Sequence, residues 1–355
     1  MTGGDEIGVR LRVEGKVGRI TLDRPEALNA LTLPMIEAMD RQLRIWADNP
    51  SVVMIMIEGA GGKAFCAGGD IAWLYAQMRS GDLDEARRFF RYEYRLNQLI
   101  ATYPKPYVSL MHGIVIGGGV GVSAHGSHRI VTEKTLLVLP ECSIGLIPDV
   151  GTSCLLGRAP GYLGEYIGLT GLRLNGADAI AARFADFFVP SSGLADLSSA
   201  LIAEPTLPTI KRFAQAPEAS QLTQIGAEID TIFNIHGGGR AEGIERGLAA
   251  SSADWAPAAL RAIRQASPLS IHCALVAIRH GRRINLVWKA LTIEYRFVYR
   301  ALAQGDFAEG IRAAVIDKDR KPKWVHVSFD DVTDADIEAM FISLGEHELS
   351  SRERT

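Results

Sequence analysis

The chain has 355 residues, of which 47% are hydrophobic and 22% are charged. These shares are those of an ordinary folded globular protein, so a chain that is disordered along its length is excluded. The formal net charge of -3 gives no general attraction to nucleic acid or to anionic membranes. We therefore expect neither nucleic acid nor a membrane among its partners.

The length exceeds what one hydrophobic core usually supports, so a core with a further region is expected. Pro205, Pro208 and Pro217, separated by polar residues, indicate a junction. We predict a core of residues 1–204 that carries the functional site, followed by a helical C-terminal region of residues 205–355.

The cysteines and the N-terminal residues bear on the compartment. The four cysteines show no CxxC spacing and the histidines do not cluster, so neither a zinc site nor a disulfide framework is indicated. Residues 1–7 lack an apolar signal core and the Arg-rich character of a transit peptide. The near-apolar run of residues 113–124 is shorter than the ~20 residues of a membrane-spanning helix. We expect a soluble cytoplasmic protein without a metal.

In the first half of the chain, strand patterns alternate with glycine turns and helix patterns. Alternating residues from Val9 to Leu22, around a turn at residues 14–15, predict a β-hairpin. Apolar residues spaced three to four apart predict an amphipathic helix from Leu33 to Asn49. Further strands are predicted at residues 52–57, 106–111, 130–132 and 136–139, and further helices at 71–78, 83–99 and 120–125. This order favours an α/β fold of stacked β-β-α units.

From about residue 160 onward the pattern becomes mainly helical. Helices are predicted at residues 177–182, 194–202, 225–232, 257–266, 270–280 and 286–304. The fold class is therefore α/β with a mainly helical C-terminal region.

Two carboxylates, Glu141 and Asp149, interrupt the otherwise apolar residues 139–151. A charge in apolar surroundings is costly unless it is paired or used, so this pair indicates a site. The alternative is that they cap helices or pair with buried arginines such as Arg158.

Two glycine-rich segments, residues 66–70 and 116–121, directly precede predicted helices. Backbone N–H groups at such turns favour a negative oxygen, and two facing turns could form an oxyanion hole. The alternative is that the glycines only connect strands to helices. Neither segment matches GxGxxG or GxxxxGK[ST] in its required context, so a dinucleotide site and a P-loop are disfavoured.

Other reactive residues near these segments have simpler interpretations. Cys66 and Cys142 could support thiol chemistry, but without a Cys-His pattern a packing role is favoured. His112 and His125 bracket the second glycine turn, and such isolated histidines are more often core residues. Glu93 lies among arginines and would ordinarily be a solvated ion-pair residue.

Taken together, several segments resemble the crotonase, or enoyl-CoA hydratase/isomerase, superfamily. The matching segments are residues 22–31, 63–71, 112–119, 140–141 and 147–148. Within the superfamily, the chain is similar to hydrolases of 3-hydroxyacyl-CoA thioesters such as 3-hydroxyisobutyryl-CoA. This closer similarity involves residues 68–70, 93–97, 117–121, 148–151, 294–296 and 307–324. The resemblance covers nearly the whole chain and implies a crotonase-type spiral.

The resemblance also implies roles for individual residues. Backbone N–H groups of Gly69 and Gly118 would hold the thioester oxygen, and Glu141 would attack the carbonyl carbon or activate water. Asp149, with Glu93 near the pocket, would recognise a 3-hydroxyl group. The substrate-binding residues that it implies are Glu93, Gly118, Glu141, Asp149, Ala27 and Ala67.

Two departures from the superfamily pattern affect these expectations. Related hydratases carry a second glutamate where this chain has Gly121, while Asp149 stands where they have a small residue, so hydrolysis is preferred over hydration. Glu26 stands where relatives often carry a lysine for coenzyme A phosphates, and Arg24 or Lys63 would take over that contact.

The resemblance therefore implies hydrolysis of a 3-hydroxyacyl-CoA in valine breakdown. A thioester needs only hydrogen-bond donors and a carboxylate, so no metal or redox cofactor is expected, and coenzyme A is part of the substrate. Two alternatives remain: an enoyl-CoA hydratase or isomerase, and a non-catalytic acyl-CoA-binding protein. Assembly into a homo-oligomer, such as a trimer, through the C-terminal helices is a further expectation from the resemblance.

Overall fold

The computed structural model describes residues 7–234 and 240–350. The chain forms two compact units that are interleaved along the sequence. The first unit comprises the residues up to Gly69, Arg95–Val138 and Arg173–Thr223, and the second comprises Asp70–Tyr94, Leu139–Leu172 and the residues from Gln224 onward. The division into residues 1–204 and 205–355 stays a prediction, because a functional division need not follow compactness.

The strands of the described chain all belong to the first unit. They are β1 (Val9–Glu14), β2 (Val17–Leu22), β3 (Met54–Gly59), β4 (Ala64–Cys66), β5 (Tyr107–Met111), β6 (Ile114–Ile116), β7 (His128–Val131), β8 (Leu136–Val138) and β9 (Phe187–Phe188). One sheet has the order β1-β2-β3-β5-β7-β9, and a smaller sheet has the order β4-β6-β8.

The two sheets arise from a repeated path of the chain. The predicted hairpin is confirmed by the antiparallel pair β1 and β2, whereas the later pairings are parallel. Each successive pair, β3 with β4, β5 with β6 and β7 with β8, adds one strand to each sheet. Because parallel strands are covered on both faces, β5 is buried at every position and is apolar except for Ser109, whose hydroxyl donates to the carbonyl of Ser123.

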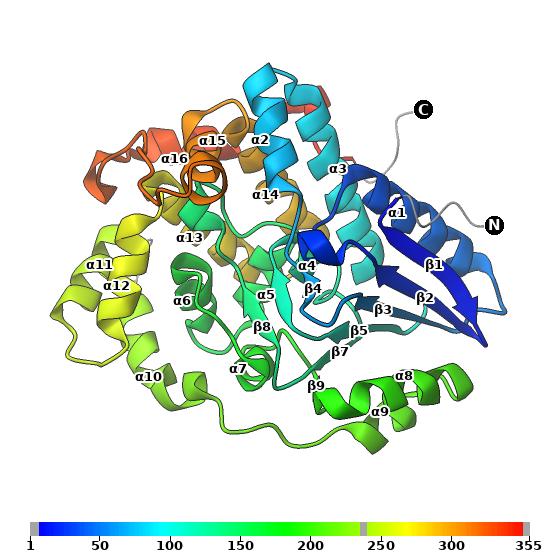
Figure 1. The fold of residues 1–355 in the computed structure, drawn as a ribbon. Coiled ribbons are helices and arrows are strands. Elements are labelled where there is room, and N and C mark those ends of the chain that lie inside the picture. Colours follow the sequence, from blue (N-terminus) through cyan, green and yellow to red (C-terminus); the bar gives the residue numbers. More distant parts are fainter. Residues whose placement is uncertain (1–6, 235–239, 351–355) are drawn as a thin grey trace. The chain divides into compact units, whose positions relative to one another are not determined.

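The helices of the first unit include two that cover one face of the larger sheet (Figure 1). The elements are α1 (Leu33–Asp48), α4 (Gly118–Gly121), α7 (Gly176–Ala181), α8 (Leu194–Ala203), α9 (Leu207–Phe213), η1 (Pro25–Ala27) and η3 (Ser191–Gly193). Leu197 and Leu201 of α8 and Ile210 of α9 pack against Val108 and Ile130 of the sheet. Each such fully buried side chain contributes roughly 1.5–3 kcal/mol.

One prediction in this unit needs correction, and one segment holds a helix that was not predicted. The short helix expected at residues 120–125 is α4, which begins at Gly118, because Gly117 has a φ of 50° and already completes the turn. The proline-rich junction contains α9, since the Thr206 side chain accepts a hydrogen bond at its start and Pro208 stands where a helix tolerates proline.

The second unit is helical within the described residues. Its elements are α2 (Ile71–Ser80), α5 (Thr152–Arg158), α6 (Leu163–Thr170), α11 (Ala241–Ala250), α12 (Ala256–Gln265), α13 (Pro268–Ile284), α14 (Val287–Ala301), α15 (Gly305–Ile311), α16 (Asp334–Phe341), η2 (Glu141–Ile144), η4 (Arg312–Ile316), η5 (Phe329–Asp331) and η6 (Gly345–His347). The helices α3 (Leu83–Ala101) and α10 (Gln221–Phe233) are divided between the units. The predicted helical character of the C-terminal region is confirmed.

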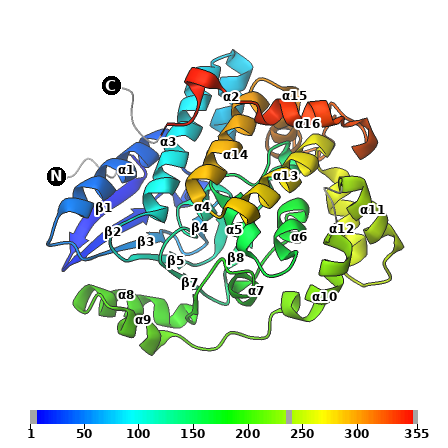
Figure 2. The ribbon, with the colours of Figure 1, turned by 180° about the vertical axis from the view of Figure 1, so that it is seen from behind.

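Helices α5 and α13 approach each other with their backbones in contact. A Cβ atom on Gly281 would lie 2.3 Å from the carbonyl oxygen of Ser153, and one on Gly157 would lie 2.4 Å from the amide nitrogen of Arg282. Any larger residue would push the helices apart. Helix α14 runs beside α13 and also contacts α5 (Figure 2), so its side chains reach the start of α5.

Candidate active site

Four buried carboxylates gather in the second unit. Glu93 comes from α3, Glu141 from η2, Asp149 from the turn before α5, and Glu294 from α14. Their exposed fractions are 2%, 4%, 4% and 0%, respectively. The structure thus brings together the three carboxylates predicted from the sequence, Glu93, Glu141 and Asp149, and adds a fourth.

Glu141 is buried without satisfying its hydrogen-bonding capacity. Neither carboxylate oxygen has a hydrogen-bond partner among the described residues. Burial raises the pKa of the Glu141 carboxyl well above its usual range, and repulsion from Asp149 adds to the shift. A buried acceptor with free lone pairs is costly in a purely structural role but suits a nucleophile or a general base.

Asp149 is held by a tyrosine that the sequence interpretation did not assign to the site. The Tyr94 hydroxyl donates a hydrogen bond of 2.7 Å to Oδ2 of Asp149. Burial raises the pKa of Asp149 to about 7, while the bond from Tyr94 opposes that rise. Burial and repulsion from Asp149 likewise raise the pKa of Glu93 well above its usual range. Glu93 is therefore not the solvated ion-pair residue of the simpler interpretation.

The turn after Asp149 is bonded to Glu294, which was also not assigned to the site. Glu294 accepts hydrogen bonds of 2.7 Å from the amide of Gly151 and 3.1 Å from the amide of Ser153. The Ser153 hydroxyl donates to the same oxygen as its own amide. Burial raises the pKa of Glu294 to about 8, against the lowering effect of these bonds.

The alternatives of an arginine partner and of a helix cap can be compared with the contacts of Glu141, whose oxygens accept no hydrogen bond among the described residues. Arg158 donates through Nε to Oδ1 of Asn285, a residue at the end of α13. Glu141 stands in the first turn of η2, where Pro140 is the capping position and no side-chain capping bond is present. Glu141 is therefore explained neither by a hydrogen bond from an arginine nor by a cap on η2.

The two glycine turns lie against each other within the first unit. A Cβ atom on Gly68 would lie 3.5 Å from the amide nitrogen of Gly118, and one on Gly119 would lie 2.4 Å from the carbonyl oxygen of Cys66. Only glycine permits this approach at residue 119. The turns are thus neighbours, as an oxyanion hole made from both requires.

The segment with Ala27 is tied to the first of these turns. The amide of Ala67 donates to the carbonyl of Leu28 at 3.0 Å, and the amide of Leu31 donates to the carbonyl of Gly68 at 2.7 Å. A bridge joins Leu31 to Gly69. The structure therefore brings together Ala27, Ala67, Gly69 and Gly118 in the first unit.

The cysteines and His112 have structural contacts. The Cys142 thiol lies 3.5 Å from the carbonyl oxygen of Gly168, and burial raises its pKa well above the usual range. Cys66 accepts a contact of 3.4 Å from the amide of Gly68. His112 Nδ1 lies 3.1 Å from the Thr132 hydroxyl. These contacts favour the packing interpretation over thiol chemistry.

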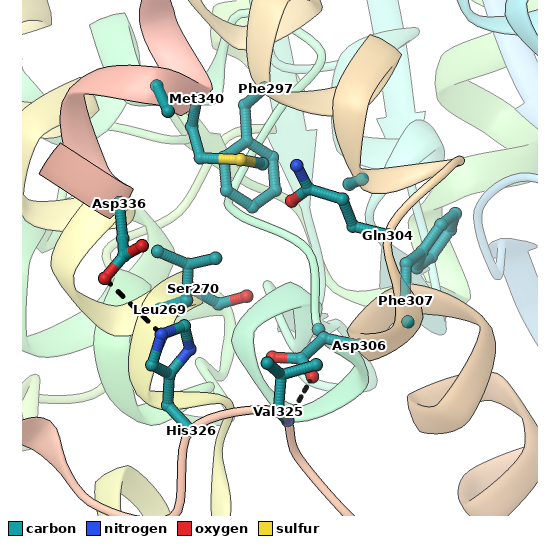
Figure 3. A pocket seen from close by; sticks show the side chains of 14 residues that line it. Leu269, Ser270, Phe297, Gln304, Asp306, Phe307, Val325, His326, Asp336 and Met340 are labelled. Atoms are coloured by element: carbon teal, nitrogen blue, oxygen red, sulfur yellow. Dashed lines mark hydrogen bonds and ion pairs between the residues drawn. The ribbon is translucent and has the colours of Figure 1, made fainter. Parts of the chain in front are cut away.

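A separate cavity of about 400 Å³ lies in the second unit (Figure 3). Its apolar wall includes Phe297, Phe307 and Met340, and His326 beside Asp336 stands at its polar side, 3.6 Å apart. None of the site residues predicted from the sequence lines this cavity. This cavity is therefore distinct from the predicted site residues of either unit.

Two further properties concern the described ranges only. Residues 7–234 and 240–350 contain no group of three or more His, Cys, Asp or Glu side chains arranged to hold a metal ion. No helix within these ranges has the length and apolar character that crossing a bilayer requires.

The paired sheets of the first unit and the buried carboxylates of the second define a crotonase-type α/β protein with a candidate acyl-transfer site. A family model described as enoyl-CoA hydratase/isomerase matches residues 17–341. The chain belongs to this family, and the predicted family and fold are confirmed.

Individual relatives carry names of two kinds. The mitochondrial 3-hydroxyisobutyryl-CoA hydrolase of Xenopus laevis is 40% identical over 96% of this chain and 90% of its own length. The structure of an enoyl-CoA hydratase from Rhodobacter sphaeroides 2.4.1 is 44% identical, with a TM-score of 0.92, and the match covers 97% of this chain and 99% of that one. A carnitinyl-CoA dehydratase from Mycobacterium thermoresistibile is 40% identical, with a TM-score of 0.93 over 98% and 99% of the two chains. The resemblance to hydrolases of 3-hydroxyacyl-CoA thioesters is confirmed by the first relative.

Proposed function

We propose that this protein hydrolyses 3-hydroxyisobutyryl-CoA to 3-hydroxyisobutyrate and coenzyme A. The observation that carries the proposal is Glu141, buried with both oxygens unbonded among the described residues, in a cluster with Asp149. Position 121, where related hydratases have a second carboxylate, is a glycine. One reactive carboxylate and one beside it for recognition fit hydrolysis better than the addition of water to a double bond.

The chemical step requires an electrophilic carbonyl and a place for negative charge. We propose that the N–H groups of Gly69 and Gly118 donate to the thioester oxygen, which becomes negative as the carbonyl carbon is attacked. In one route the Glu141 carboxylate attacks, the C–S bond breaks, coenzyme A leaves as the thiolate, and water then opens the mixed anhydride. In the other route Glu141 takes a proton from water, the water oxygen attacks the carbonyl carbon directly, and the C–S bond then breaks with coenzyme A leaving as the thiolate. Both routes give the same products.

Substrate selection is assigned to Asp149 and Glu93. A carboxyl beside the 3-hydroxyl group can form a hydrogen bond that plain acyl groups cannot offer. A substrate without the hydroxyl would leave that buried carboxyl without its partner, which penalises binding. Ala27 and Ala67 are proposed to contact the substrate, and the exposed Lys63 is proposed to contact a phosphate of coenzyme A.

The setting of the reaction is proposed on chemical grounds. Thioester hydrolysis by a carboxylate needs no metal or redox cofactor, and coenzyme A enters as part of the substrate. We place the reaction in valine breakdown and the protein in the cytoplasm, as a homo-oligomer. All four cysteines lie in the described ranges as free thiols, which fits a reducing compartment, whereas the Xenopus relative is named as mitochondrial.

A second candidate is an enoyl-CoA hydratase or dehydratase, because the two similar structures carry such titles. It predicts the loss or gain of conjugated enoyl absorbance without release of coenzyme A. A third candidate, a non-catalytic acyl-CoA-binding protein, predicts binding with no product from any thioester.

The test is an assay of free thiol with 3-hydroxyisobutyryl-CoA as substrate. We expect release of coenzyme A by the wild type and none above background by Glu141→Gln, with Glu338→Gln, an exposed carboxylate on α16, as the control. Thiol release by Glu141→Gln at the wild-type rate would remove Glu141 from the chemistry. Absence of thiol release with a change in enoyl absorbance would establish the hydratase alternative.

A further inference from the structure

The backbone that follows Asp149 adopts an unfavourable conformation. Val150 has a φ of 51°, which is rare for a residue branched at Cβ, and Gly151 continues with a φ of 81°. A β-branched residue in this left-handed region is strained, because its Cβ crowds the neighbouring backbone. Such a turn persists only where the surrounding structure holds it.

Glu294 supplies hydrogen bonds on the C-terminal side of this turn. Helix α5 begins at Thr152 with Gly151 as its capping residue, which has no side chain to accept a bond from the helix. Glu294 replaces that missing cap, because it accepts from the amides of Gly151 and Ser153 and from the Ser153 hydroxyl. These bonds span 141 to 143 positions of the chain.

Asp149 is hydrogen-bonded both through its backbone carbonyl and through its side-chain carboxyl. The carbonyl oxygen of Asp149 accepts bonds of 2.8 Å from the Thr152 amide and 2.6 Å from the Thr152 hydroxyl. At the other end, its carboxyl accepts the bond from Tyr94. The residue between Asp149 and the capped helix is the strained Val150, so release of the cap frees the turn that orients the carboxyl.

The burial of the Glu294 carboxyl has a cost in free energy that packing alone does not offset. Its side chain is fully buried, and removing a carboxylate from water costs several kcal/mol unless good hydrogen bonds replace the water. It also lies close enough to Asp149 for each charge to disfavour the other. The three hydrogen bonds that Glu294 accepts at the start of α5 are what offset this cost.

We propose that Glu294 is a positioning residue that determines selectivity for 3-hydroxylated acyl groups. By capping α5 at Gly151 and Ser153, it keeps the Val150 turn closed and the Asp149 carboxyl directed at the substrate's hydroxyl. This inference rests on the proposed function, in which Asp149 recognises that hydroxyl. Glu294 itself touches neither the thioester nor the hydroxyl in this scheme.

The test compares Glu294→Ala with the wild type on 3-hydroxyisobutyryl-CoA and isobutyryl-CoA. We expect kcat/KM for the hydroxylated substrate to fall about tenfold or more, and that for isobutyryl-CoA to fall less than about threefold. Glu294→Gln should be intermediate, because one amide oxygen can accept from Gly151 or from Ser153 but its amino group cannot. Ser153→Ala, which removes one of the three donors, should shift the ratio in the same direction by a smaller factor.

Glu165→Ala is the matched control. Glu165 is another buried carboxylate of the second unit, bonded to Arg282 at 2.6 Å. Its loss should lower stability without changing the ratio between the two substrates. Equal losses on both substrates in a folded Glu294→Gln protein would show that Glu294 is only structural and would overturn the inference.

Failure of the proposed function has a different signature. If the wild type already cleaves both substrates equally well, Asp149 does not recognise the hydroxyl, and the selectivity role falls with it. A crystal structure of Glu294→Ala then examines the positioning alone. An unchanged Val150 turn and an intact bond between Tyr94 and Asp149 would overturn that part as well.

Discussion

The cluster of buried carboxylates predicts that stability depends on pH in an identifiable way. Burial raises the pKa of Asp149 to about 7 from an ordinary value of 3.8. Between these values the unfolded chain releases this proton while the folded protein retains it. The contribution of the Asp149 proton to the free energy of unfolding is therefore complete at low pH, and it is lost as the pH rises through about 7. Asp149→Asn has no proton to release and lacks this dependence.

The size of the effect follows from the proton that the folded state retains. Each pH unit between the two pKa values lowers the wild-type free energy of unfolding by about 1.4 kcal/mol through this one group. Between pH 5 and pH 8 we expect the stability of Asp149→Asn relative to the wild type to increase by about 3 kcal/mol. Buried histidines with lowered pKa values, such as His272, act in the opposite direction but do so in both proteins.

The measurement is urea unfolding of both proteins at pH 5, 6, 7 and 8, followed by tryptophan fluorescence. In the Asp149→Asn variant the Tyr94 hydroxyl can still donate to the side-chain amide oxygen at position 149, so the packing around the turn is preserved. Glu338→Gln, exposed on α16, serves as the control and should follow the wild type. A stability difference between Asp149→Asn and the wild type that stays constant within about 0.5 kcal/mol from pH 5 to pH 8 would show that Asp149 is ionised throughout, and the reasoning would be wrong.

Three further predictions concern substitutions at single positions. Gly119→Ala places a Cβ atom 2.4 Å from the carbonyl oxygen of Cys66, and we expect a loss of about 1–3 kcal/mol in urea unfolding. Gly226→Ala in α10, where a Cβ meets no atom within 4 Å, should instead gain up to about 1 kcal/mol. Tyr94→Phe removes the bond that lowers the pKa of Asp149. The Asp149 ionisation should therefore move to higher pH, measurable in the pH profile of kcat/KM for a hydroxylated substrate, and an unchanged profile would contradict its role.

Features that depend on neighbours in sequence were predictable. The hairpin of β1 and β2 follows from alternation and a glycine turn, and α1 follows from its apolar spacing; both are confirmed. Glu141 and Asp149 were recognisable because a charge inside an apolar run is unusual. Their roles stay predictions, since burial and spacing do not identify a substrate.

Features that depend on backbone angles or capping were harder to predict. The start of α4 depends on the positive φ of Gly117, and a run of three glycines does not indicate which one makes the turn. Helix α9 lies within a proline-rich segment because Thr206 and Pro208 happen to suit the start of a helix. The same residues would also suit an irregular junction.

Glu294 shows where sequence reasoning could have gone further and where it could not. In α14 it shares the buried face with Leu291, Tyr295 and Val298, so the helical spacing places a carboxylate among core residues. A buried carboxylate must find hydrogen-bond donors, and the spacing therefore predicts that partners exist. It cannot name them, because the amide of Gly151 is 143 positions away and follows a turn in which Val150 has a positive φ. Recognition of Asp149 as a site residue thus came from local sequence, whereas the means of holding it required the fold.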